Sequence, residues 1–347
     1  MNTFNVLLTC VGGEFGSYMV NAMKNGAHRV RVIGIDHNPR AAGGPFCDLF
    51  LPAPTGRDPK YPSFISKLVS DQKVDLIIPT SDEEALVLSH IKENFLGTTV
   101  ATVSPVLLTK LSSKISTYKL LEKNNLPCPE WAEVREWEKL LTVTEFFLNK
   151  YGRVVVKPSI SRGGRDVFHV QKENCESTTR IRETYLSFSS FKINFKAEFD
   201  KHYPVVVMEE LVGPVHDLDM LAWEGRPLVV VPRKRLDSDS PNSGHLVLDN
   251  PSFIEMGKNI IQRLHLSWLY DCDFMFDKNG KPKIIEINPR QSGSVSISIA
   301  AGIPLLDHVI SLAKKLKVEA DFKVTQQTVV PFISLAKMPI NNDERPS

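Results

Sequence analysis

The sequence predicts an α/β protein in which a parallel α/β domain comes first and hairpins of strands follow. Two observations support this fold class. Over residues 1–104, short apolar runs alternate with stretches of helical spacing, which is typical of a parallel sheet. Near the other end of the chain, residues 271–290 form two apolar strands separated by Asn279-Gly280, the strongest short signal for a hairpin.

The bulk composition is that of an ordinary globular protein. The 347 residues are 42% hydrophobic and 24% charged, enough for two or three packed units. The 42 basic and 40 acidic residues are well mixed and give a net charge of +2, so no footprint for nucleic acid or membrane stands out. The five cysteines are scattered without C-x-x-C spacing, which argues against disulfides and zinc.

The N-terminus lacks the basic start of a signal peptide, and no run approaches the ~20 apolar residues of a membrane helix. We therefore expect a cytoplasmic protein that binds small molecules and neither nucleic acid nor membrane.

The first domain is predicted from three apolar runs, which are residues 4–11, 30–36 and 74–79. Between the first two, GSYMVNAMKNG has the apolar spacing of a helix and ends at Gly26. The acidic cluster Ser81–Glu84 follows the third run at a predicted helix start, where negative charge complements the helix dipole.

The opening strand, turn and helix come close to a dinucleotide-binding fingerprint. Gly13 and Gly16 fit the last two glycines of G-x-G-x-x-G, and Asp36 ends the next strand. Val11 occupies the first glycine position, where the tight turn needs glycine. A structural turn, or a loop facing an acidic substrate, is therefore favoured over NAD or FAD binding.

Lys157 is the candidate phosphate-binding residue of the middle segment. Residues 152–170 read as a strand, a polar glycine loop and a second strand, and Lys157 ends the first strand directly before the loop. It could be an edge-strand gatekeeper. It is equally well placed to reach phosphate oxygens together with the backbone N–H groups of Gly163 and Gly164.

Further strands and a basic cluster follow. Residues 104–125 are helical in pattern, 205–212 form a buried strand ending in two glutamates, and two strands flank a turn at 224–226. The cluster at 233–235 is Arg-Lys-Arg, and such a cluster is usually a solvated face. Recruitment of an anionic substrate is the competing interpretation.

The hairpin carries its acidic residues on one face. If Asn279 and Gly280 are the two loop residues, two opposed pairs follow, Asp273 with Glu286 and Asp271 with Asn288. Like charges in opposition repel, so this face predicts a hard cation, and oxygen ligands point to Mg²⁺. A solvated acidic face is the alternative. A loop of odd length would shift the register and break the pairing.

Taken in order, these pieces resemble the ATP-grasp superfamily, and specifically its carbamoyl-phosphate-synthase-like branch of carboxylate–amine ligases. The resemblance covers residues 4–313 and rests on SKISTYKLLEKNNLPCP, VVVKPSISRGG, VVMEELVG and, above all, DFMFD…IIEINPRQSG. It implies a two-lobed grasp fold with antiparallel sheets after a Rossmann-like domain. The expected divisions are a preceding domain at 1–104, a small lobe at 105–190, a large lobe with the metal site at 191–337 and a disordered tail at 338–347.

The resemblance also implies ATP and Mg²⁺, with Mn²⁺ as the alternative metal, and assigns residues to them. The implied metal ligands are Asp273, Glu286 and Asn288, whereas Asp271 comes from the hairpin geometry alone. The implied nucleotide contacts are Lys114, Lys157, Ser161, Gly163, Gly164, Glu209, Glu210 and Leu211. Arg290 is expected to steady the transferred phosphoryl group or the acyl phosphate, and Arg233 or Arg235 the acidic substrate.

One position departs from the family pattern. Val215 stands where the family usually has a glutamate for the ribose hydroxyls. The neighbouring His216 or Asp217 could take this role.

The chemistry that the resemblance implies is phosphoryl transfer from ATP to a small carboxylate, giving an acyl phosphate that an amine attacks, with ADP as product. One alternative is a phosphotransferase or a bicarbonate-activating subunit of carbamoyl-phosphate type. The other is a non-catalytic nucleotide-binding subunit. The expected partners are a small carboxylate and an amine, and a homodimer is expected from base rates alone.

Overall fold

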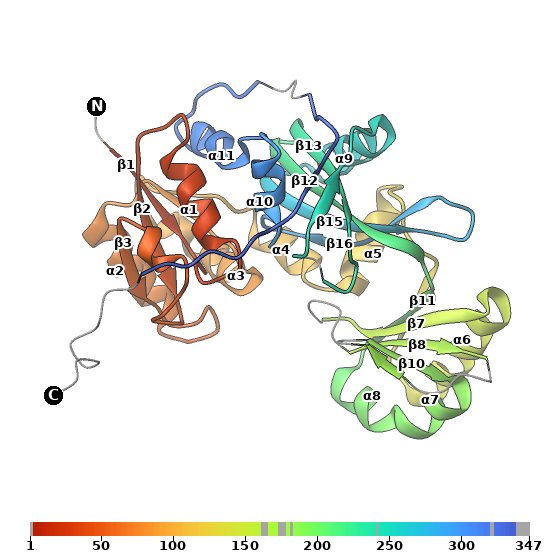
Figure 1. The fold of residues 1–347 in the computed structure, drawn as a ribbon. Helices are drawn as coiled ribbons and strands as arrows, with labels where there is room; N and C mark the ends of the chain where they lie inside the picture. Colours follow the sequence, from red (N-terminus) through yellow and green to blue (C-terminus); the bar gives the residue numbers. More distant parts are fainter. Residues whose placement is uncertain are drawn as a thin grey trace. The chain divides into compact units, whose positions relative to one another are not determined.

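The structure is a computed structural model that describes residues 3–160, 166–172, 178–180, 183–240, 242–319 and 323–337. Its internal contacts divide the chain into two compact units (Figure 1). Unit 1 comprises Met1–Thr109, His216–Cys272 and Asn288–Ser347, and unit 2 comprises Lys110–Val215 and Asp273–Ile287. Each unit is therefore assembled from segments that are far apart in the sequence.

Unit 1 contains the predicted parallel α/β domain. Its five-stranded sheet has the order β3-β2-β1-β4-β5, and every pair is parallel. The strands are β1 (Phe4–Leu8), β2 (Val30–Asp36), β3 (Leu49–Pro52), β4 (Leu76–Ile78) and β5 (Thr99–Val100). The helices are α1 (Gly16–Lys24), α2 (Tyr61–Gln72) and α3 (Asp82–Ile91), with the short 3₁₀ helices η1 (Gly44–Phe46) and η2 (Lys92–Asn94). The parallel sheet predicted from the alternation is confirmed.

The central strand of this sheet is apolar on both faces because helices cover both. Leu7 enters one core with Tyr61 of α2, while Val6 enters another with Met19 of α1. The predicted acidic helix start is confirmed at α3, where the Ser81 hydroxyl accepts a hydrogen bond from the Glu84 N–H.

Unit 2 is built on a six-stranded sheet of order β6-β11-β7-β8-β10-β9. The strands are β6 (Trp131–Val134), β7 (Arg153–Pro158), β8 (Val167–Gln171), β9 (Thr178–Arg180), β10 (Glu183–Ser187) and β11 (Val205–Glu209). The helices of this stretch are α4 (Pro105–Leu111), α5 (Lys114–Lys123), α6 (Trp137–Tyr151), α7 (Phe188–Asn194) and α8 (Lys196–His202). Because β11 pairs with β6 and β7, this sheet extends beyond residue 190, where the sequence placed the end of the small lobe.

A second six-stranded sheet has the order β16-β15-β12-β13-β14-β17. Its strands are β12 (Val212–Trp223), β13 (Arg226–Arg235), β14 (His245–Val247), β15 (Trp268–Phe276), β16 (Pro282–Asn288) and β17 (Gln327–Val329). The helices of this part are α9 (Pro251–Leu264), α10 (Val295–Ala300) and α11 (Leu305–Ala313). The predicted strand pair around residues 224–226 is the antiparallel pair β12–β13.

The loop between β15 and β16 corrects the two-residue turn that the sequence predicted. Asp277 donates its N–H to the Lys281 carbonyl at 2.9 Å, and Gly280 donates to the Asp277 carbonyl at 2.9 Å. Gly280 has a φ of +76°, which suits glycine. The loop is therefore three residues long, Lys278–Gly280, because the positive φ falls on Gly280 as a bulge after an ordinary turn.

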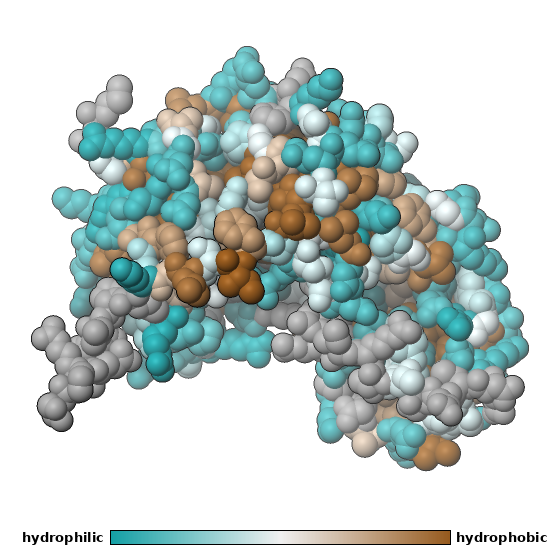
Figure 2. All heavy atoms as spheres, viewed as in Figure 1, coloured by the Kyte–Doolittle hydropathy of each residue, from teal (hydrophilic) through white to brown (hydrophobic). Residues whose placement is uncertain are grey.

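The surface is mixed, as the composition predicts. Figure 2 shows a largely hydrophilic face interrupted by apolar groups. The exposed apolar side chains include Phe332, Ile333 and Leu335, which follow β17. Among the residues that the structure describes, no helix has the length and apolar character needed to cross a membrane.

Gly16 is required by packing. A Cβ there would lie 1.9 Å from the Val11 carbonyl oxygen, whereas a Cβ at Gly13 would lie 3.6 Å from its nearest neighbour, the Cys10 carbonyl oxygen. Gly16→Ala is expected to lower the free energy of unfolding of unit 1 by about 1–3 kcal/mol, because backbone must move to make room. Gly13→Ala is the matched control and should change it by less than about 0.5 kcal/mol. Denaturant unfolding followed by tryptophan fluorescence measures both, and equal midpoints for the two variants would contradict the argument.

Candidate functional site

A buried lysine, a tyrosine and a strand carbonyl form the centre of the candidate site in unit 2. Lys157 on β7 donates from Nζ to the Tyr118 hydroxyl at 3.0 Å, and this hydroxyl donates to the Ile285 carbonyl of β16 at 3.0 Å. Lys157 and Tyr118 are buried. The chain of hydrogen bonds thus connects the predicted phosphate-binding lysine to the strand that carries the predicted metal ligands.

Lys114 meets the same strand. It is the first residue of α5, and its N–H donates to the Ser159 carbonyl at 2.8 Å, which fixes the helix start beside the end of β7. Its Nζ lies 4.0 Å from Oε2 of Glu286, and the two side chains are 11% and 30% exposed. Two lysines and a carboxylate predicted from separate segments therefore come together, an arrangement suited to phosphate and a divalent cation.

The charge of Lys157 depends on this environment. Burial lowers the pKa of Lys157 to about 7, and the neighbouring charge of Lys114 acts in the same direction, against the attraction of Glu286. An anion bound beside the lysine restores the charged form, because opposite charge raises the pKa of an amine. Lys157 is therefore poised to take up a proton when a polyanion binds.

Glu209 and Glu210, two of the nucleotide contacts that the resemblance implies, are held by protein partners. Glu209 is buried, and its Oε1 accepts a hydrogen bond from the Glu130 N–H at 2.8 Å. Glu210 follows β11, and its Oε1 lies 2.9 Å from Nδ1 of His169. Leu211, the next residue in the sequence, is also buried. The carboxylates of both glutamates thus help to hold this segment in place.

Sequence reasoning missed a charged cluster around His169. Its Nε2 lies 3.1 Å from Oε2 of Glu183, so carboxylates engage both ring nitrogens, and its ring stacks on Tyr185 with the centroids 4.3 Å apart. His169 and Tyr185 are register partners on β8 and β10. The residues of the cluster are too far apart in the chain for any local pattern to indicate them.

The pKa of His169 follows from these partners. Burial disfavours the charged ring, but the hydrogen bonds with Glu183 and Glu210 outweigh it and raise the pKa of His169 above its ordinary value.

The predicted loop residues Ser161, Gly163 and Gly164 lie outside the described residues.

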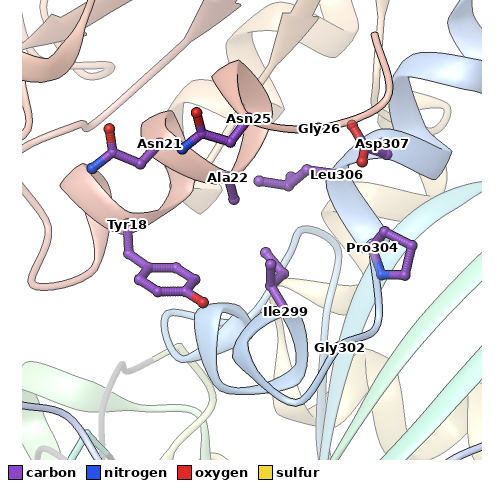
Figure 3. Close-up of a pocket in the computed structure, with 10 residues that line it drawn as sticks. All are labelled: Tyr18, Asn21, Ala22, Asn25, Gly26, Ile299, Gly302, Pro304, Leu306 and Asp307. Atoms are coloured by element: carbon purple, nitrogen blue, oxygen red, sulfur yellow. The ribbon is translucent and has the colours of Figure 1, made fainter.

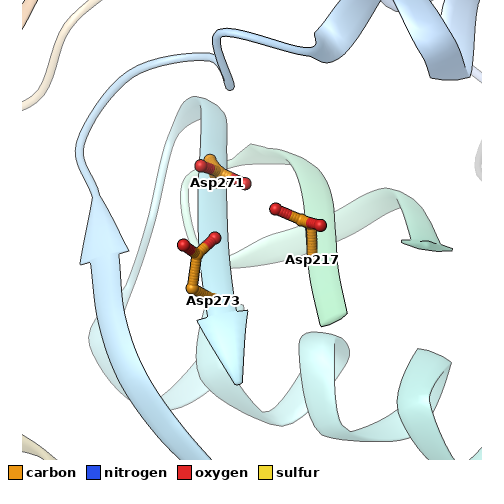
Figure 4. A group of neighbouring side chains, drawn as sticks. All are labelled: Asp217, Asp271 and Asp273. Carbon is orange, nitrogen blue, oxygen red and sulfur yellow. The ribbon is translucent and has the colours of Figure 1, made fainter. Parts of the chain in front are cut away.

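Three aspartates gather on the adjacent strands β12 and β15 (Figure 4). Asp217, Asp271 and Asp273 each offer a carboxylate oxygen, and these atoms lie within 4.8 Å of one another. Asp271 and Asp273 are two residues apart on β15, so the pleat turns both to one face of the sheet. The sequence predicted Asp271 and Asp273 here and assigned Asp217 to the ribose instead.

This cluster fits a hard cation. Oδ1 of Asp271 is buried and has no hydrogen-bond partner among the described residues, while Oδ2 accepts from Asn288 Nδ2 at 3.1 Å. Burial, followed by the charges of Asp217 and Asp219, raises the pKa of Asp271 to about 7. Mg²⁺ prefers oxygen ligands and usually rests on one or two carboxylates, so this cluster suits it.

The contact between Asn288 and Asp271 was predicted from a turn that the structure corrects. In β16 the buried residues Ile284 and Ile287 are three apart, so the strict alternation of the strand is interrupted. The predicted contact is nevertheless present, with Asn288 beside Asp271.

Asp217 is tied to a basic partner. Arg235 donates from NH2 to Oδ1 at 2.6 Å and from Nε to Oδ2 at 3.2 Å, and His245 Nδ1 lies 3.4 Å from Oδ2. Burial acts to raise the pKa of Asp217, but Arg235, Arg233 and His245 lower it to about 2. The other ribose candidate, His216, is buried with its ring against Phe253.

The two arginines of β13 differ in access. Arg233 has no exposed surface, and its guanidinium donates to Asp219 at 3.0 Å and to the Ser294 hydroxyl at 2.8 Å. The Arg235 side chain is 13% exposed. Of the two alternatives for contacting an acidic substrate, the geometry favours Arg235, because Arg233 is enclosed by the chain before α10.

Arg290 stands between two carboxylates of unit 1. Its Nε lies 3.1 Å from Oδ1 of Asp82, and its NH1 lies 3.9 Å from Oδ2 of Asp271. NH1 also donates to the Gln291 carbonyl at 2.9 Å. The arginine predicted for the phosphoryl group is thus beside the aspartate cluster of β15.

A separate pocket of ≈ 410 Å³ lies between α1 and the α10–α11 region of unit 1 (Figure 3). It is lined by Tyr18, Asn21, Ala22, Asn25, Gly26, Ile299, Gly302, Pro304, Leu306 and Asp307. None of the predicted site residues lines it.

The parallel domain and the two further sheets form a mixed α/β fold that matches a two-domain ATP-grasp. Residues 201–334 match the family described as an ATP-grasp in the biosynthetic pathway with Ter operon. Residues 6–103 match the PylC-like N-terminal domain. No curated protein sequence matches the chain.

Three solved structures share the fold. The N5-carboxyaminoimidazole synthetase of Staphylococcus aureus is 16% identical over 92% of this chain and 80% of its own, with a TM-score of 0.68. The biotin carboxylase domain of Hydrogenobacter thermophilus 2-oxoglutarate carboxylase is 14% identical over 90% and 70%, with a TM-score of 0.69. The L-amino acid ligase of Bacillus licheniformis is 14% identical over 91% and 75%, with a TM-score of 0.62.

The His169 cluster makes the stability of unit 2 depend on pH. A histidine whose folded-state pKa is raised stabilises the fold fully below its unfolded pKa of about 6.5 and loses this contribution as the pH rises through the folded value. His169→Gln should therefore destabilise unit 2 more near pH 6 than near pH 9. Denaturant midpoints at both pH values and NMR titration of the ring check this. A ring that titrates at or below its ordinary pKa would refute it.

Proposed function

We propose that the protein is an ATP-dependent, ADP-forming ligase that activates a small carboxylate as an acyl phosphate and joins it to an amine. The observation that carries the proposal is the meeting of Lys157, Lys114 and Glu286 in unit 2. Phosphoryl transfer needs positioning and charge neutralisation more than covalent help from the protein. Two amines beside a carboxylate on the metal-binding strand meet that need.

The residues would divide the work as follows. Lys157 and Lys114 bind the phosphates, and the segment from Glu209 to Leu211 receives the base. Asp273, Glu286 and Asn288 are the proposed metal ligands, and the cluster geometry adds Asp271 and Asp217 as neighbours able to share the ion. Bound Mg²⁺, or Mn²⁺, neutralises charge on the phosphate oxygens.

The acid-binding side of the reaction is proposed for unit 1. Arg290 is suited to hold the transferred phosphoryl group or the acyl phosphate, because its guanidinium lies within 3.9 Å of the metal-site carboxylate Asp271. Arg235, partly exposed and paired with Asp217, is suited to contact the carboxylate substrate.

We also propose a cytoplasmic location.

The structural neighbours support the class of reaction and also supply the main alternative. One is named a synthetase and another an amino acid ligase, and both join molecules. The carboxylase domain was solved as a dimer with MgADP and bicarbonate, which favours bicarbonate as the alternative acceptor and a homodimer as the assembly to test.

Product analysis with Mg²⁺-ATP, hydroxylamine and pools of amino acids and small carboxylates tests the proposal. Acid-dependent ADP with hydroxamate is the expected result, because hydroxylamine traps acyl phosphates. AMP as the nucleotide product would contradict it. ADP that depends on bicarbonate and gives no hydroxamate would favour the alternative acceptor.

Glu286→Gln separates an enzyme from a nucleotide-binding scaffold. Loss of a metal-ligand charge is expected to lower turnover by about 100-fold or more. Glu138→Gln, on the exposed face of α6 in the same unit, removes the same charge and should leave turnover unchanged. Steady-state ADP release measures both variants, and equal rates would show that Glu286 has no part in the chemistry.

Nucleotide binding should be coupled to proton uptake. Lys157 has a pKa of about 7 in the free protein, so it is mostly neutral near pH 8, and phosphate binding should recharge it. Calorimetry of Mg²⁺-ATP binding in buffers of different ionisation enthalpy is expected to show uptake near pH 8 and little near pH 6. Lys157→Met should abolish the uptake. An uptake that persists in this variant would assign it to another group.

A further inference from the structure

The carboxylate of Asp82 is the nearest acidic partner of Arg290, yet it comes from a different part of the sequence. Asp82 is the first residue of α3, which follows the central strand β4 of the parallel sheet. Arg290 follows β16, and its Nε lies 3.1 Å from Oδ1 of Asp82. The two side chains are only 18% and 16% exposed, so this contact is largely shielded from water.

The orientation of the Arg290 guanidinium is set from several sides. The Asp82 carboxylate forms an ion pair with Nε at 3.1 Å that lacks hydrogen-bond geometry, the Gln291 carbonyl accepts from NH1, and Asp271 lies 3.9 Å from NH1. The guanidinium is thus anchored by a hydrogen bond at NH1 and attracted electrostatically at Nε. The charge of Asp82 opposes the attraction of Asp271 for the other end of the guanidinium.

We propose that Asp82 is a positioning residue for Arg290 and that it makes the N-terminal sheet domain a working part of the active site. This inference rests on the proposed function, in which Arg290 holds the transferred group. Without the Asp82 charge, the attraction of Asp271 is no longer opposed from the Nε side, and the guanidinium is drawn toward that carboxylate. The arginine then offsets the charge of Asp271, which neighbours the proposed metal ligand Asp273. It no longer offsets the charge of the reacting phosphoryl group.

The adjacent residue provides a matched control. Glu83 lies in the same first turn of α3 and also pairs with an arginine, Arg57, at 2.9 Å, but that arginine is 77% exposed. Asp82→Asn and Glu83→Gln each remove one negative charge, one ion pair and one favourable interaction with the helix dipole. A purely structural role for the ion pair at Asp82 predicts similar consequences for both variants.

The first measurement is ¹⁵N NMR of the arginine Nε–H groups, with the Arg290 signal assigned through Arg290→Lys. The Arg290 Nε chemical shift is expected to be the same in the wild type and in Glu83→Gln and to move in Asp82→Asn, because the neighbouring charge and the guanidinium orientation change there. This readout needs no substrate. An Arg290 signal that is the same in all three proteins overturns the inference.

The second measurement is hydroxamate formation at saturating and limiting ATP. Asp82→Asn should lower kcat by about 10- to 100-fold, the scale of an ångström misplacement. Its KM for ATP should stay within about 2-fold of the wild type, since the proposed nucleotide contacts belong to unit 2. Asp82→Glu should recover part of the loss, because its carboxylate can still reach Nε.

Failure of the proposed function can be distinguished from failure of the inference about Asp82. A wild-type protein that forms no hydroxamate with any acid overturns the proposed function. An active wild type with equal kcat for Asp82→Asn and Glu83→Gln overturns the inference about Asp82 and leaves the proposed function standing.

Discussion

The Tyr118 hydroxyl is the contact on which the nucleotide side of the candidate site depends. It accepts from Lys157 and donates to the Ile285 carbonyl, so one buried group satisfies a buried amine and a strand carbonyl at once. Among the described residues no carboxylate forms an ion pair with Lys157, and burial makes its charged form costly. The tyrosine offers a neutral acceptor, which leaves the charge of the lysine available to a ligand.

The aspartate side follows the opposite rule, because there the charges are paired within the protein. Asp219 binds Arg233 with no exposed surface on either side chain, and the buried Asp217 binds the partly exposed Arg235. Buried ion pairs are seldom a net gain in stability, since desolvation offsets the attraction. Their value here is geometric: they join β12 to β13. Among the residues that the structure describes, Oδ1 of the neighbouring Asp271 has no hydrogen-bond partner.

Particular residues show which parts of the fold and of the candidate site could be predicted from the sequence. The alternation of apolar runs correctly predicted the parallel sheet, and the acidic start of α3 was confirmed by its Ser81 cap. The hairpin turn was predicted with the wrong length, because the Asn-Gly pair is compatible with a three-residue loop as well as a two-residue one. The contact of Asp271 with Asn288 was nevertheless found.

The sequence by itself determined the identity of the chemical groups: which lysines, carboxylates and arginines are present, and which of them end strands. Local spacing fixes these features, because the pleat and the helical turn are properties of neighbouring residues. Only the tertiary structure decided that His169 is enclosed by Glu183 and Glu210, that Arg233 is buried while Arg235 is not, and that Asp82 meets Arg290. Those relations depend on sheet order and on packing between distant segments, and no local periodicity in a single chain encodes them.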